Sequence, residues 1–365
     1  MTSLLLLSAA ALCGYLWMKV RKEPPQTAKG APDSAQAAAE LGLVPADELG
    51  TADACAPDPY DEEIRATVRA GDWRAGAAFL DGAGQDWQER YRRAAVLQDE
   101  AADDDAWLLA WRAARPQDAG AALVHAGALI GVAAQVHGTN PARRPTWEQS
   151  RVFHQVMVRA REACHEAQAL ACDDPCPYIA EISCALGLGY GHDDCRALWA
   201  AVVERDAYHL VAHEAVLRYW CHKWRGSHEP AESFAREAER LGSPGQLLSL
   251  LPLYAAFKQD RSDQNTDADV YYKSPELIAA VDACLADVAA AAAADPEDRR
   301  IVRARHMLAW TLYWQDRYEA AVEQFRVIDG HFDGGAPWSY FGNPKFFYVQ
   351  CRDYSAMQVV GANGD

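Results

Sequence analysis

The sequence predicts an all-α protein built from pairs of helices joined by short turns. Half of the chain is apolar, alanine dominates, and runs of valine, isoleucine and threonine are scarce. This composition favours helix over strand. The pattern is clearest in residues 305–328, where an apolar helical stretch, a polar turn at 315–317 and a second helical stretch follow one another. Such pairs bury their apolar faces only against neighbouring pairs, so we expect an extended array of stacked helices.

The C-terminal pair resembles one tetratricopeptide-type helix–turn–helix unit. Leu308 and Ala309 match the large–small pair of its first helix. Tyr318, Ala321 and Phe325 match the aromatic, small and large positions of its second helix. The resemblance implies a right-handed helical-repeat solenoid and a binding function.

A second pair, near the start of the helical region, has the same layout in a less regular form. Gly71 and Asp72 stand where the turn between the two helices is expected. Trp73, Gly76 and Leu80 then take the aromatic, small and large positions. Gly76 costs roughly 1 kcal/mol of helix stability relative to alanine. The period between units is irregular, so we expect a degenerate tetratricopeptide-like array.

Further helices are expected between these two pairs. Asp-Pro at 174–175 and 295–296 marks two helix starts, because Asp caps a helix and Pro presets its first φ. The three acids at 103–105 are interpreted as the cap of another helix. The expected helices cover residues 106–114, 119–136, 152–171, 178–186, 195–203, 208–220, 230–241, 244–257 and 275–294.

The N-terminus is expected to reach a membrane. Residues 1–22 contain an apolar run from Leu4 to Met18, directly followed by basic residues. The run is marginally long enough to span a bilayer and lacks the preceding basic residues of a secretory signal. We interpret it as a membrane anchor or uncleaved signal, with the bulk of the chain in the cytoplasm. Export of the chain is the alternative.

Three segments follow this anchor. Residues 23–59 are interpreted as a Pro/Ala-rich linker, in which 35–43 could form a short helix without a partner face. Residues 60–330 are expected to form the α-helical repeat domain. Residues 331–365 are rich in aromatic residues and glycine without helical periodicity, so an irregular aromatic C-terminal cap and tail is expected there.

The charge of the chain restricts its partners. The formal net charge is −17, and a surface this acidic repels the phosphate backbone of nucleic acid. Nucleic acid is therefore excluded as a partner. A protein or peptide partner of neutral or basic character fits the charge, although acidity also serves solubility alone.

Cysteine and histidine are concentrated between residues 164 and 228. Because thiolate and imidazole bind zinc, Cys172, Cys176, His209 and His213 are the candidate metal ligands. Their spacing argues against a metal, since the cysteines lack a second matching pair and no glutamate lies between the histidines. Without a metal, the cysteines would be buried thiols that serve as small core residues, or disulfides in an exported chain. No cofactor is expected.

The turn at 222–227 is the strongest candidate for a binding patch, through Lys223, Trp224 and Arg225. Helix-end chemistry alone also explains the turn, with Gly226 expected in the left-handed conformation and the next residue as a cap. The turn resembles that of an uncharacterised bacterial family of tetratricopeptide-like helical proteins with a Lys-Trp-x-Gly-Ser motif. The resemblance covers about residues 107–256 and implies no known activity.

No catalytic motif is evident. The glycine-rich stretch at 187–191 follows a helical pattern rather than a strand, and it is interpreted as a helix-ending turn. Trp310, Tyr313 and Trp314 could line a binding groove, or they could pack between helices. The sequence therefore predicts a membrane-tethered scaffold or adaptor without catalysis. A Cys/His-rich metal-binding or redox-sensing protein and a structural component of an envelope assembly are the alternatives.

Overall fold

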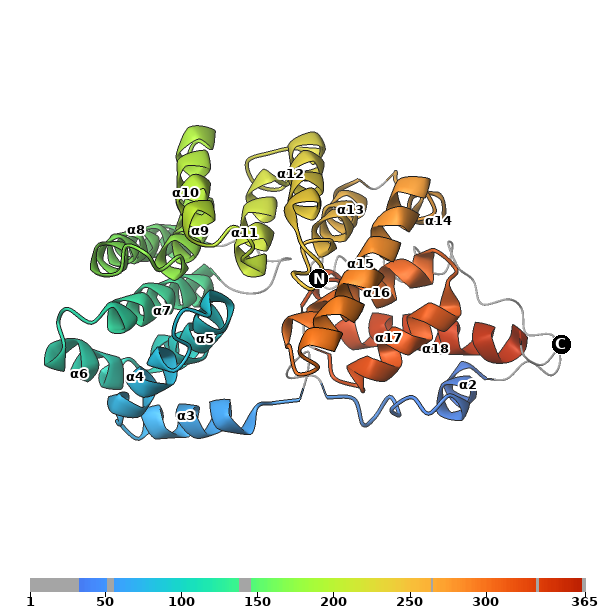
Figure 1. Ribbon diagram of the computed structural model, residues 1–365, viewed down its shortest axis with the longest axis horizontal. Coiled ribbons are helices and arrows are strands. Elements are labelled where there is room, and N and C mark those ends of the chain that lie inside the picture. The colour runs from blue at the N-terminus through green and yellow to red at the C-terminus, as the bar shows by residue number, and fades with distance from the viewer. Residues whose placement is uncertain (1–32, 51–55, 138–145, 264, 333–334, 363–365) are drawn as a thin grey trace, which may run out of the picture. The chain divides into compact units, whose positions relative to one another are not determined.

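The computed structural model describes residues 33–50, 56–137, 146–263, 265–332 and 335–362. Within these ranges the chain folds into seventeen α-helices and one short 3₁₀ helix, and it contains no β-strand. The prediction of an all-α protein is thereby confirmed (Figure 1). The expected anchor at 1–22 lies outside the described residues.

The chain divides into two compact units. The continuous unit is Pro57–Ser227, and the split unit combines the chain up to Ala56 with residues 228–365. The helical domain expected over 60–330 is thus shared between them.

The continuous unit holds helices α3 to α11, most of which pack against a near neighbour in the chain (Figure 1). Their bounds are α3 Pro59–Arg69, α4 Trp73–Asp81, α5 Trp87–Asp103, α6 Ala106–Ala114, α7 Ala119–His137, α8 Trp147–Leu170, α9 Cys176–Leu188, α10 His192–Arg205 and α11 Leu210–Trp220. Part of the core is a stack of tryptophan rings, in which Trp111 lies 6.2 Å from Trp73 and 6.5 Å from Trp107 between ring centroids.

Side-chain caps explain where several of these helices begin. Asp58, Asp72 and Asp86 each accept a hydrogen bond from a backbone N–H in the first turn of the helix that follows. Of the three acids at 103–105, Asp104 accepts from the N–H of Ala106 at 3.1 Å, whereas Asp105 makes no side-chain cap bond and Asp103 ends α5. The capping interpretation therefore holds for Asp104 alone.

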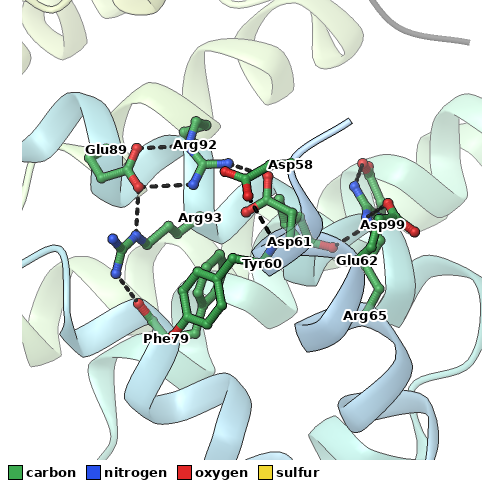
Figure 2. Close-up of polar contacts among 11 residues, drawn as sticks. Asp58, Tyr60, Asp61, Glu62, Arg65, Phe79, Glu89, Arg92, Arg93 and Asp99 are labelled. Carbon is green, nitrogen blue, oxygen red and sulfur yellow. Dashed lines mark hydrogen bonds and ion pairs between the residues drawn. The ribbon is translucent and has the colours of Figure 1, made fainter. Parts of the chain in front are cut away.

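An arginine network joins the first three helices of this unit (Figure 2). Glu89 on α5 accepts from Arg92 Nε at 2.7 Å and from Arg93 Nε at 2.6 Å. Arg92 also pairs with Asp61 on α3, and Arg93 donates to the carbonyl of Phe79 on α4 at 2.8 Å. The network fixes α5 beside both helices of the first pair.

The split unit holds the remaining helices. Their bounds are α2 Ser34–Glu40, α12 His228–Leu241, α13 Leu250–Ser262, α14 Ala268–Tyr271, α15 Pro275–Ala294, α16 Arg300–Trp314, α17 Tyr318–Ile328, the 3₁₀ helix η1 Trp338–Tyr340 and α18 Pro344–Ala362. Helix α16 is at its centre and packs against α13, α15, α17 and α18.

The C-terminal segment was expected to be irregular, but most of it is helical. Residues 344–362 form the nineteen-residue helix α18, which packs on α16 and α17. Its buried residues, among them Phe347, Tyr348, Cys351 and Ser355, are spread around much of the helix, so no single apolar stripe marks it in the sequence.

The expected linker also carries structure. Helix α2 occupies 34–40, close to the short helix considered at 35–43, but it does have a partner, because it packs against α18. Ala37, Ala38, Leu43 and Leu49 are buried there. The partner lies about 310 residues later in the chain, a separation at which sequence patterns carry no signal.

Two helices, α7 and α15, are long and apolar enough to cross a membrane by length and composition. A core helix of a soluble protein passes the same test, and 56% of the apolar window of α7 is buried inside the fold, against 28% for α15.

Candidate functional site

The predicted patch residues Lys223, Trp224 and Arg225 lie in the turn that follows α11, and all three are exposed. The turn is held by its backbone: the N–H of Trp224 donates to the carbonyl of Cys221 at 2.9 Å, and that of Arg225 donates to the carbonyl of Tyr219 at 3.2 Å. Trp224 exposes 44% of its surface, and Lys223 Nζ lies 5.8 Å from the centre of its indole.

Gly226 is required here for a different reason from the one expected. It is not among the described glycines with a positive φ, so the left-handed conformation predicted for it is wrong. A Cβ at this position would lie 1.9 Å from the carbonyl oxygen of Trp220. Only glycine allows the turn to fold back this closely on the end of α11.

A second turn, at 187–191, packs against the first. It ends α9 as predicted, with Gly189 in the left-handed conformation at φ 73°. The Arg225 guanidinium lies over Gly189, where a Cβ would meet Nη2 at 1.7 Å. His192, directly after the turn, has its Nε2 2.8 Å from the Arg225 carbonyl oxygen, and the Tyr219 hydroxyl donates to the carbonyl of Tyr190 at 2.8 Å.

The two turns together present cations and aromatic rings. The ring of His192 lies edge-on to Trp220 at 5.1 Å between centroids, and the Arg196 guanidinium lies 5.4 Å from the Trp220 ring. We call this group of side chains the two-turn surface. It consists of His192, Arg196, Trp220, Lys223, Trp224 and Arg225.

The local charge of the two-turn surface is opposite to that of the chain. Arg196, Lys223 and Arg225 contribute three cations. The acids on the adjoining first turn of α10 are Asp193 and Asp194, and Arg196 pairs with Asp193 at 2.9 Å. The net local charge is positive on the turn after α11, in a protein of net charge −17.

A buried carboxylate, that of Glu181, holds one of the turns that form the two-turn surface. Glu181 on α9 accepts from the Tyr190 hydroxyl at 2.9 Å and from Gln168 Nε2 at 2.7 Å, and it contacts His165 Nε2 at 3.1 Å. Burial and the hydrogen bond to Glu181 raise the pKa of Tyr190 above its ordinary value. The phenol therefore stays protonated and holds the 187–191 turn in place.

The candidate metal ligands contact backbone carbonyls and do not converge on a metal position: two of the four share one carbonyl, a third contacts another, and the fourth is exposed. Cys176 Sγ and His209 Nε2 lie 3.7 and 3.2 Å from the carbonyl oxygen of Trp87. His213 Nδ1 lies 3.0 Å from the carbonyl oxygen of His209. Both imidazoles thus use a ring N–H to hold a backbone carbonyl. Cys172 is exposed, apart from these three buried residues.

The metal-binding alternative therefore has no ligand set in the described ranges, where no group of three or more His, Cys, Asp or Glu side chains could hold a metal ion. The eight cysteines of those ranges are thiols rather than disulfides, and seven of them are buried. This agrees with the interpretation of most of them as small core residues.

A cavity of 390 Å³ opens beside the same place. It is lined by residues at the start of α5, in the turn after α8 and at the end of α10, namely Gln85, Trp87, Cys172, Asp173, Glu204 and Arg205. Arg205 is already engaged: its Nε donates to the Cys172 carbonyl at 2.6 Å, and its guanidinium stacks on Tyr178 at 4.1 Å.

The candidate groove residues on α16 are core residues. Trp310, Tyr313 and Trp314 are all at least 99% buried. Trp310 Nε1 donates to the Tyr272 hydroxyl at 3.2 Å, and its ring contacts Trp314 at 5.7 Å. They hold helices together, so their proposed role as binding residues is wrong, and they pack between helices instead.

Sequence reasoning found both turns but missed His192, Arg196 and Trp220. The available signal was the spacing of His192 and Arg196, which are four positions apart, on either side of the start of the helix expected at 195–203. Nothing in the sequence connects that helix to the turn at 222–227.

No protein-family model, curated protein or solved structure matches this chain.

Proposed function

We propose that the chain is a helical-repeat scaffold or adaptor that binds an acidic protein segment through the two-turn surface. The observation that carries the proposal is the combination of exposed Trp224 with cations on a turn held by backbone hydrogen bonds. Lys223 and Trp224 are free to contact a partner, whereas Arg225 and Gly226 fix the backbone that presents them. Preorganised aromatic and cationic side chains lose little entropy on binding.

The charge of this surface selects the partner. The net charge of the chain favours basic or neutral partners, but the cations here attract carboxylates at short range. An acidic segment that carries an aromatic or aliphatic side chain would pair its carboxylates with Lys223 and Arg196. Its apolar side chain would then cover Trp224.

The repeat character of the scaffold is supported by two helix pairs. In α3–α4 the positions of Trp73, Gly76 and Leu80 are buried, as are Ala321 and Phe325 at the equivalent small and large positions of α17. Leu308 and Ala309 on α16 are fully buried. These burial patterns favour a degenerate tetratricopeptide-like solenoid.

We also propose that residues 1–22 tether the scaffold to a membrane, with the described residues on the cytoplasmic side. The support is the apolar run and the basic residues that follow it. In sealed vesicles whose lumen is the cytoplasmic side, protease added outside should leave the helical units intact. Their digestion before the vesicles are opened would contradict this orientation.

The binding proposal is tested with a fluorescein-labelled peptide of glutamates around one phenylalanine, and with its lysine counterpart. Fluorescence anisotropy should show binding of the glutamate peptide to the full chain, weakening as salt is added. Trp224→Ala and Lys223→Glu should each weaken it about fivefold or more, since each contact is worth roughly 1 kcal/mol.

Trp147→Ala is the matched control. Trp147 is also an exposed tryptophan of the continuous unit, 79% exposed, with the Arg151 guanidinium 5.7 Å from its ring. It lacks the fixed turn, and its loss should leave binding unchanged. Equal binding of the two peptides, or equal effects of the Trp147 and Trp224 variants, would contradict the proposal.

A further inference from the structure

Residues 33–50 belong to the split unit and pack on its C-terminal part, residues 228–362; we call them the latch and use split unit below for that C-terminal part. The latch begins with helix α2 and continues without regular structure to Gly50. Helix α2 has seven residues, too few to be helical in water without a partner, and α18 supplies that partner (Figure 1). The latch therefore owes its conformation to the split unit.

The split unit recognises the latch largely through the latch backbone. Arg352 Nη1 donates to the carbonyl of Val44 at 2.7 Å, and Arg326 Nη2 donates to that of Leu41 at 3.4 Å. Arg352 is almost fully buried, so the carbonyl of Val44 is an acceptor that a buried cation needs. If the latch leaves, another backbone carbonyl or water must replace it.

The far end of the latch is held like an added strand. The N–H of Gly50 donates to the carbonyl of Gly330 at 3.1 Å, and the N–H of Phe332 donates to the carbonyl of Gly50 at 2.9 Å. These two bonds make an isolated parallel bridge. Main-chain pairing combined with buried apolar side chains is the way in which grooves bind peptides.

The groove is shaped to the latch at one position. Gly330 has a φ of 73°, and a Cβ there would lie 2.9 Å from the Cβ of Val44. Residue 330 is not part of the latch, but a side chain there would push Val44, and with it the latch, away.

One charge interaction is unfavourable to the docking of the latch. Burial raises the pKa of the Asp353 carboxyl on α18, and the negative charge of Asp33 at the start of the latch raises it further. Arg352 offsets part of this by donating from Nε to Asp353 at 2.7 Å. The apolar anchor of the latch is small, two alanines and two leucines, as expected of a segment that can be exchanged.

We propose that α17, α18 and residues 328–332 form a peptide groove, which the latch fills in cis and which takes the same kind of segment in trans. That segment is a short alanine-rich helix followed by two leucines six residues apart. Tethering gives the latch a high effective concentration, so a peptide in trans binds only after the latch is displaced. The groove is in the split unit and is independent of the two-turn surface.

The test uses the full chain with the latch released by Leu43→Asp and Leu49→Asp, which leave the groove unchanged. The probe is a fluorescein-labelled synthetic peptide of residues 33–50. We expect it to bind the released variant at least tenfold tighter than the wild type. Adding Gly330→Ala to the released variant should abolish binding. A control variant, Asp47→Ala with Glu48→Ala, changes two exposed latch residues and should behave as the wild type.

Two results would overturn the proposal. One is equal binding of the peptide to the wild type and the released variant, including no binding to either. The other is loss of the near-ultraviolet circular dichroism of the aromatic core in the released variant, because the latch would then be part of that core rather than an occupant of a groove.

Discussion

Arg90 Nε donates to Asp174 Oδ2 at 2.7 Å, joining two buried side chains that lie 84 positions apart in the chain. Asp174 also accepts from the N–H of Cys176 at 2.7 Å, and so it caps the start of α9. Arg90 also donates to the carbonyl of Leu80 at 3.4 Å. One ion pair thus links the end of α4, the start of α5 and the start of α9.

Breaking this pair from one side should destabilise the continuous unit. Arg90→Met leaves Asp174 as a buried charge without its cation, which costs roughly 3–5 kcal/mol of unfolding free energy. Adding Asp174→Asn should recover a large part of the loss. Urea unfolding followed by tryptophan fluorescence measures both. Arg112→Met, which removes the partly exposed pair with Glu166, is the control and should cost less than about 1 kcal/mol.

His213 should make the continuous unit sensitive to mild acid. Burial lowers the pKa of His213 to about 4, below the ordinary value of about 6.5. The unfolded chain then binds a proton at a pH where the folded chain does not. Above pH 6.5 this difference does not affect the free energy of unfolding. As the pH falls towards 4, it lowers that free energy by roughly 3 kcal/mol in all.

The comparison is between the wild type and His213→Gln, each unfolded in urea at pH 7 and at pH 4.5. The variant should show a smaller loss of unfolding free energy between the two pH values. The contributions of other groups are common to both proteins. An equal loss would mean that His213 is not held neutral.

Gly226 should not tolerate a side chain. Gly226→Ala brings a Cβ against the Trp220 carbonyl, and we expect a loss of roughly 1–3 kcal/mol together with changed fluorescence of the nearby indoles. Gly191→Ser is the control, because a Cβ there meets only Asp194 at 3.5 Å and the hydroxyl can cap α10, which has no side-chain cap. Equal stability of the two variants would disprove the close approach.

Thiol labelling should single out Cys172. It is the exposed one of the eight cysteines in the described ranges, so it should react with a maleimide in the folded protein within minutes. The seven buried cysteines of these ranges should react only in denaturant. Mass spectrometry counts the labels, and Cys172→Ser should lower the native count by one. Rapid native labelling of Cys164 or Cys184 would contradict their burial.

The sequence predicted helices well where an apolar stripe and a stop signal coincide. The helix at 275–294 was expected with the bounds that α15 has, because Pro275 starts it and Asp295 ends it. Helix α5 was not predicted, since its arginines and acids mask the apolar stripe. Arg92 pairs with Asp61 on α3, and Arg93 donates to the Phe79 carbonyl on α4, as Figure 2 shows. Such pairing between helices cannot be deduced from the sequence of one helix.

The candidate site was predictable in parts but not as a whole. Glycine and tryptophan at 222–227 marked one turn, and glycines marked the other at 187–191. Their contact depends on how α9, α10 and α11 pack, which no local pattern encodes. The error at Trp310 has a related cause: α16 is buried on nearly every side, so its aromatic residues look the same in sequence whether they line a groove or fill a core.

The division of the split unit has a consequence for the order in which the protein can form during translation. About 300 residues separate Gly50 from Pro344, which at roughly 5–20 residues per second is on the order of 15–60 s of synthesis. The continuous unit can complete its own core within that time. The latch cannot dock in that time, because α18 is synthesised about 300 residues after it. Until then the leucines of the latch are open to any chaperone or neighbouring nascent chain.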